Sequence, residues 1–228
     1  MKKVIVGMLA GVFVVLTGCV VEPLDRVVFL SQVDDRSARM VFYEILRSEI
    51  DKYGISNDPR EDGVVSVSFV DFNNDGLPEL IFSRRFDGGS GVYYFVYGYA
   101  ENAAQLLFEG IATPFSTGPT SFHVVLSNNG EKFLAQTTSH QWSFTAYYYS
   151  FADGESVVAL SRYILRSMEP GEDDKEIVIE NHYVNGENVS EEIYLNSVLT
   201  ELGVPLNIIY LIPYGNAYEK FETLSAVE

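Results

Sequence analysis

The chain has 228 residues, among them 32 Asp or Glu and 15 Lys or Arg, which gives a formal net charge of −17 at pH 7. This acidity excludes binding to nucleic acid through the backbone phosphates, because that mode needs clustered positive charge. Hydrophobic residues make up 47% and aromatic residues 14%, which predicts a folded core in one compact domain or two small ones. The acidity is typical of a soluble surface in a cation-rich exterior, or it serves solubility alone.

The first segment, 1–18, has the organisation of a bacterial signal peptide. Lys2 and Lys3 form a basic start, and the apolar run from 4 to 16 is shorter than the roughly 20 residues of a membrane-spanning helix. The last part, Leu16-Thr17-Gly18-Cys19, resembles a bacterial lipobox. The resemblance implies that Cys19 carries a diacylglyceryl group, that the peptide is cut before it, and that acyl chains anchor the protein. An ordinary secretory signal and an uncleaved anchor are the alternatives.

Cys19 is the only cysteine of the chain. It therefore has no partner for a disulfide within the chain, which agrees with the role in lipid attachment. Residues 19–33 lack a clear period and are expected to form a tether. The remainder, 34–228, is expected to be a single β-rich domain.

Two amphipathic helices are predicted, one near each end of this domain. Apolar residues recur at helical spacing from 35 to 53, and Asp34 or Asp35 can cap the start. The segment 190–203 predicts the second helix, with Ser190 as its cap.

Between the helices, short runs rich in β-branched and aromatic residues alternate with Gly, Asn and Asp turns, the pattern of an antiparallel β meander. The expected strands cover 64–71, 79–86, 91–99, 104–111, 121–127, 132–139, 143–151, 156–165, 176–184 and a short piece near 188. Asn185-Gly186 predicts a two-residue hairpin turn, because both positions need positive φ. The run LNIIYLIPYG at 206–215 is a candidate for a last strand.

An internal repeat organises these strands. ELIFSRR at 79–85 aligns with KFLAQTT at 132–138, and the units of about 64–111 and 121–165 each have the anatomy of one propeller blade. Two blades cannot close a propeller, so we expect a mainly β (α+β) fold. It would be an antiparallel meander of about nine to ten strands in two blade-like units, with an N-terminal and a C-terminal helix. Generic meander patterning is the alternative to duplication.

The stretch VDFNNDGLPELIF, residues 70–82, predicts a metal-binding loop. In a tightly curled loop alternate side chains turn inward, and a glycine at 76 permits the sharp turn. Ca²⁺ takes roughly six to eight oxygen ligands, whereas Mg²⁺ keeps its water and demands a stricter octahedron. The candidate ligands for one Ca²⁺ ion are Asp71, Asn73, Asp75, the Leu77 carbonyl and Glu79. The alternative is an Asx-type turn that merely joins two strands.

The sequence DFNNDGLPEL resembles the D-x-[DN]-x-D-G-x-x-[DE]-L loop of FG-GAP and VCBS-type calcium repeats. The whole arrangement is similar to a group of bacterial envelope lipoproteins, mostly of unassigned function, that carry one such loop and a late NGxxVSEEEY hairpin and helix. This chain has NGENVSEEIY at 185–194. The resemblance implies a fold, one calcium ion and ligands at the positions given above, but no activity. The second unit, LSNNGEKF, lacks the matching acids, so only one ion is expected.

Motifs of known catalytic sites are scarce in the chain. His123, His140 and His182 are scattered near different expected strands, and no paired carboxylates indicate a glycosidase. An enzyme is therefore the less favoured interpretation, though a hydrolase with an unrecognised acidic site stays open.

Aromatic residues in the strands indicate a binding surface or a core. The candidates for an exposed aromatic face are Tyr93, Tyr97, Trp142, Tyr147 and Tyr149. On a sheet surface such rings stack on sugars or contact a protein, whereas in a core they only pack. The expected protein is a calcium-stabilised lipoprotein, anchored outside the bacterial cytoplasm, that binds a protein or a glycan. A purely structural envelope component is a further alternative.

Overall fold

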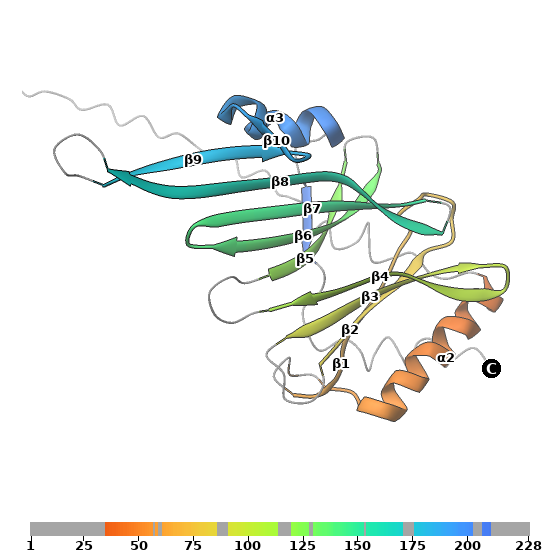
Figure 1. Cartoon of the computed structure of the whole chain (residues 1–228). Helices are drawn as coiled ribbons and strands as arrows, with labels where there is room; N and C mark the ends of the chain where they lie inside the picture. Colours follow the sequence, from red (N-terminus) through yellow and green to blue (C-terminus); the bar gives the residue numbers. More distant parts are fainter. Residues whose placement is uncertain are drawn as a thin grey trace, which may run out of the picture.

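The computed structural model describes residues 35–56, 58, 61–85, 91–113, 120–127, 130–152, 154–170, 176–202 and 207–210. These residues form two antiparallel sheets with a helix on the outer side of each (Figure 1). The mainly β fold with an N-terminal and a C-terminal helix is thus confirmed. The expected signal peptide, Cys19 and the tether lie outside the described residues. No helix in the described part of the chain is long and apolar enough to cross a membrane.

Helix α2 (Arg36–Tyr53) begins and ends where its sequence provides caps. The Asp35 side chain accepts hydrogen bonds from the amides of Ser37 and Ala38, and the Gly54 amide donates to the carbonyl of Ile50. Asp35 therefore satisfies two of the amide groups that a helix leaves unpaired at its start.

The first sheet is a four-stranded meander in the order β1-β2-β3-β4. Its strands are β1 (Gly63–Val70), β2 (Glu79–Arg85), β3 (Val92–Ala100) and β4 (Ala103–Ala112). Ala38, Phe42 and Leu46 of α2 are fully buried against one face of this sheet. An ion pair of 2.9 Å between Arg84 Nη1 on β2 and Glu49 Oε2 on α2 adds to this contact.

The second sheet has seven strands in the order β10-β9-β8-β7-β6-β5-β11. Its strands are β5 (Thr120–Leu126), β6 (Lys132–His140), β7 (Ser143–Ala152), β8 (Glu155–Pro170), β9 (Glu176–Val184), β10 (Glu187–Val189) and β11 (Asn207–Tyr210). Asn185 and Gly186 form the β9–β10 turn with φ of 50° and 85°, as the sequence predicts. Strand β8 runs past the expected end at 165, because its last residues pair with β9 from Glu176 onward.

Three hydrophobic cores separate the layers. One core lies between the two sheets, one lies between α2 and the four-stranded sheet, and one lies between the seven-stranded sheet and α3 (Glu191–Leu202). Tyr194, Val198 and Leu202 of α3 pack in the last of these cores. The order of layers is therefore helix, sheet, sheet, helix.

The hairpins β3–β4 and β7–β8 have the same construction. Each has a two-residue turn, between Ala100 and Ala103 in one and between Ala152 and Glu155 in the other. Each also has a β-bulge at the same distance from its turn, where Leu107 in β4 and Ala159 in β8 have no cross-strand partner.

The equivalent positions of these hairpins face different cores. Val96 and Phe108, which pair beside the first bulge, lie in the core between the sheets. Their counterparts Tyr148 and Leu160 lie in the core beneath α3. The two sheets are therefore packed front to back, as neighbouring propeller blades are, and not face to face.

Candidate functional site

The predicted metal-binding loop, 71–78, joins β1 to β2. Asn74 and Gly76 have φ of 56° and 86°, so the chain enters the left-handed region at two places and curls tightly. Asn and Gly are the residue types that adopt this conformation most readily, and the sequence places them there.

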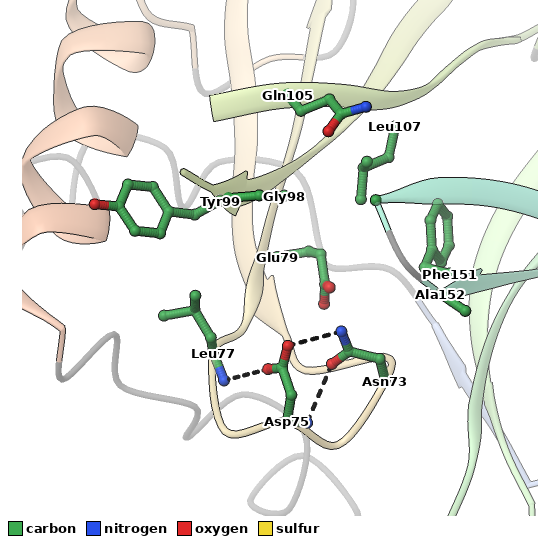
Figure 2. A pocket seen from close by; sticks show the side chains of 12 residues that line it. Asn73, Asp75, Leu77, Glu79, Gly98, Tyr99, Gln105, Leu107, Phe151 and Ala152 are labelled. Carbon is green, nitrogen blue, oxygen red and sulfur yellow. Dashed lines mark hydrogen bonds between the residues drawn. The ribbon is translucent and has the colours of Figure 1, made fainter. Parts of the chain in front are cut away.

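The polar side chains of the loop bind the loop's own amides. The Asp71 carboxylate accepts hydrogen bonds from the amides of Asp75 (3.2 Å) and Gly76 (3.1 Å). The Asp75 carboxylate accepts from the Leu77 amide (2.7 Å) and from Asn73 Nδ2 (2.8 Å), as Figure 2 shows. Both carboxylates are therefore held inside the curl.

Glu79 is the first residue of β2 and the most buried acid of the loop region, with only 4% of its surface exposed. Its Oε2 accepts a hydrogen bond from the Phe72 amide at 2.9 Å. Burial raises the pKa of the Glu79 carboxyl from 4.5 to about 7, and the negative charges of Asp75 and Asp71 add to that increase. Hydrogen bonds from backbone amides lower this pKa in part. Without a cation, this carboxyl is about half protonated near neutral pH.

A cavity of about 260 Å³ adjoins the loop (Figure 2). Asn73, Asp75, Leu77 and Glu79 form its floor, so four of the five predicted ligand residues line the same space. Its other walls come from the β3–β4 and β7–β8 hairpins and are formed by Gly98, Tyr99, Ala100, Gln105, Leu107, Phe151, Ala152 and Gly154.

Residues of the second sheet fasten the loop from outside. Lys132 Nζ, at the start of β6, donates to the Asp71 carbonyl and to Asn74 Oδ1, both at 2.6 Å. Asn74 Nδ2 in turn donates to the Gly130 carbonyl at 3.2 Å. The acid-poor loop of the second repeat unit therefore contacts the acid-rich loop of the first, a contact that the sequence did not predict.

The donor set matches the chemistry of a hard cation, because carboxylate, amide and carbonyl oxygens are the ligands that Ca²⁺ takes. The side chains do not converge on one point, however. In the part of the chain that the structure describes, no group of three or more His, Cys, Asp and Glu side chains is arranged so that it could hold a metal ion. Binding would require the carboxylates of Asp71 and Asp75 to turn from loop amides toward Glu79.

The five aromatic residues predicted as a binding face do not lie on one face. Tyr93 and Tyr97 pack in the core beneath α2, and Tyr149 packs against the core between the sheets. Trp142 and Tyr147 are 38% and 39% exposed. The grouping of the five was therefore wrong, because each side of β3 is covered by a different layer.

Sequence reasoning missed two further tyrosines, Tyr163 on β8 and Tyr183 on β9. Their rings stack at a centroid distance of 4.3 Å with an interplanar angle of 11°. They are direct cross-strand neighbours. Only the register of β8 and β9 brings them together, so no local pattern in the sequence marks the pair.

The histidines lie apart, as the sequence predicts. His123 is buried on β5, and burial lowers its pKa. His140 ends β6, and His182 on β9 has Nε2 3.7 Å from Glu180 Oε2. The described structure does not combine them into a catalytic group.

Comparison of the chain with protein-family models, curated protein sequences and solved structures finds no match.

Proposed function

We propose that the protein is a lipid-anchored component of the bacterial cell envelope, stabilised by one calcium ion on the extracytoplasmic side. In this proposal it is a non-catalytic module that binds a protein or a glycan. The observation that carries the calcium proposal is Glu79, a buried carboxylate that shares a small cavity with Asp75 and is destabilised by the charges of Asp75 and Asp71.

Charge balance favours a divalent cation at this place. Three carboxylates close together repel one another, and the burial of Glu79 removes the water that would otherwise screen its charge. A cation between them reverses both effects, since it stabilises the ionised form of each acid. Asn73 and the Leu77 carbonyl add neutral oxygens, so that Ca²⁺ would take the place of the internal hydrogen bonds of Asp71 and Asp75.

Thermal melting with calcium and with chelator tests this proposal. Extracellular calcium modules have dissociation constants of roughly 10⁻⁴–10⁻³ M, so millimolar calcium should raise the melting temperature. At a concentration tenfold above the dissociation constant the stabilisation is about 1.4 kcal/mol. Asp71→Ala and Asp75→Ala should remove the shift, whereas Glu155→Gln, a change of an exposed acid at the β7–β8 turn, should keep it. A melting temperature that does not change with calcium would refute the proposal.

The same cavity favours a second candidate function, an envelope hydrolase. Glu79 has the raised pKa of a general acid, and Asp75 lines the same space. The calcium role is favoured because Asn73 and Leu77 line the same cavity and add neutral oxygens to the two carboxylates, a donor set that suits a hard cation. Glu79→Gln separates the two functions: it would abolish hydrolysis of a substrate, but in a calcium site it would change metal affinity.

The anchor is proposed from the N-terminal sequence alone. Cys19→Ser removes the thiol that would carry the lipid. The variant should leave the membrane fraction and lose radiolabelled acyl chains when the cells grow on labelled fatty acid. Unchanged labelling of the variant would refute the lipid attachment.

A further inference from the structure

One face of the seven-stranded sheet combines tyrosines with short uncharged polar side chains. Two rows cross the strands there. Gln136, Tyr147 and Ser161 form the first row, and Thr138, Thr145, Tyr163 and Tyr183 form the second. Because side chains alternate along a strand, these residues share the face of Leu134 and Tyr149, which lie at the core between the sheets. We call these seven residues the tyrosine face.

The tyrosine face adjoins the core between the sheets and is partly exposed to solvent. Tyr147 is 39% exposed, and Tyr163 and Tyr183 are half-buried. In Figure 1 the far end of the β8–β9 hairpin extends beyond the four-stranded sheet.

Ser161 is a small side chain between two tyrosines of this face. It lies directly opposite Tyr147 and two residues before Tyr163 on the same face. Its amide donates to Asn185 Oδ1 at 2.9 Å, which fixes the strand at this position. Tyr183 stacks on one face of the Tyr163 ring, whereas the neighbour of Tyr163 along β8 on this face is the small Ser161 side chain.

The chemistry of the tyrosine face selects the ligand. The chain carries a net charge of −17, yet none of the seven residues is charged. Pyranose rings present C–H groups that pack on aromatic rings, and hydroxyl groups that pair with Ser, Thr and Gln side chains. Centres of protein interfaces are likewise poor in charge and rich in aromatic residues, Met and Arg, but four of the seven residues here are Ser, Thr or Gln, whose side chains suit the hydroxyl groups of a sugar. The acidic remainder would repel an anionic polymer.

We infer that the tyrosine face binds a neutral polysaccharide, with Tyr147 and Tyr163 as the stacking residues and Gln136, Thr138, Thr145 and Ser161 as hydrogen-bonding groups. This inference rests on the proposed binding function and names its ligand class. The binding surface is separate from the loop 71–78.

Affinity electrophoresis of the chain from residue 19 onward tests the inference. The native gels contain hydroxyethylcellulose, neutral xylan or mannan, and a gel with polygalacturonate is the charged comparison. At least one neutral polymer should retard the protein, and polygalacturonate should not. Tyr147→Ala and Tyr163→Ala should each weaken the retardation about tenfold, since each removes one stacked ring.

Leu195→Ala is the matched control, because it removes a 64% exposed apolar side chain from α3 on the other side of the sheet. Its retardation should equal that of the unchanged protein. Tyr147 is the more exposed tyrosine, so Tyr147→Ala keeps the test informative if Tyr163→Ala does not fold. The inference is overturned if none of the neutral polymers retards the protein, a result that leaves a protein partner. It is also overturned if retardation persists in both Tyr147→Ala and Tyr163→Ala. A calcium-dependent melting shift without retardation refutes only the polysaccharide inference, and retardation without a shift refutes only the calcium site.

Discussion

Replacing Glu79 by glutamine should stabilise the protein in chelator at alkaline pH, and added calcium should reduce this advantage of the variant over the wild type. The side-chain carbonyl of the introduced glutamine can still accept a hydrogen bond from the Phe72 amide, which in the wild type is 2.9 Å from Glu79 Oε2. The change therefore removes the charge and keeps the contact. In chelator the wild-type carboxylate must ionise in a buried site beside Asp75 and Asp71. In calcium the same charge becomes a ligand.

The magnitude follows from the pKa of Glu79. The folded pKa is about 7 and the ordinary value is 4.5, so the folded state holds the proton more tightly than the unfolded state. A raised acid pKa favours the folded state at low pH, and this contribution is lost as pH rises from about 4.5 to about 7. A difference of about 2.5 pKa units corresponds to about 3 kcal/mol. Glu79 is only 4% exposed, so solvent screening reduces this little.

The assay is thermal melting at about pH 5 and about pH 8, which lie on the two sides of most of this titration. In chelator, wild type and Glu79→Gln should melt alike at the lower pH, and the variant should melt roughly 6–12 °C higher at the upper pH. In millimolar calcium at the upper pH, the wild type should gain stability and the variant should gain less. Glu109→Gln, which removes an exposed charge from β4 of the same sheet, should show neither the higher melting temperature in chelator nor its reduction by calcium. Identical pH profiles of wild type and Glu79→Gln in chelator would refute the reasoning.

Two further changes test the packing around this site. Lys132→Met removes both hydrogen bonds to the loop and should lower the free energy of unfolding by about 1–3 kcal/mol in denaturant titrations. The control Lys52→Met, at the end of α2, should have little effect. Equal losses in the two variants would contradict a specific role for the Lys132 contacts. Gly110→Ala would place a Cβ 2.6 Å from Phe122 Cζ and 2.8 Å from Phe108 Cε1, inside the core between the sheets, and should cost about 1–3 kcal/mol. Gly98→Ala meets only the Leu107 side chain, at 2.9 Å from Cδ1, which can turn away, so a loss as large as that of Gly110→Ala would contradict the assigned packing.

Local patterns in the sequence were sufficient for the elements and for their order. The helix of 35–53, its Asp35 cap and the Asn185-Gly186 turn depend on neighbouring residues only, and the structure has them where the sequence predicts them. The alternation on β3 likewise separates Phe95 from Tyr94, and these residues lie in different cores.

Features that depend on strand register could not be predicted from the sequence. The pattern of β3 could not tell that α2 covers one side and the second sheet the other, so Tyr93 and Tyr97 were grouped with exposed residues. The contacts of Lys132 with the loop 71–78 join residues more than fifty positions apart. The pairing of Tyr163 with Tyr183 depends on the β8–β9 register. In each case the deciding partner is distant in sequence, and no local period encodes it.

The front-to-back packing of the two sheets also bears on self-assembly. The side of the seven-stranded sheet beneath α3 is equivalent to the side by which the four-stranded sheet meets its neighbour. A stack built in this way has no inherent last layer, and repeat proteins of this kind need terminal caps. With both helices displaced, the open front of one molecule would match the open back of another. Such head-to-tail contacts build rings where the rotation closes, and fibres where it does not. Helices α2 and α3 thus cover the two outer sheet surfaces and limit the stack to two sheets.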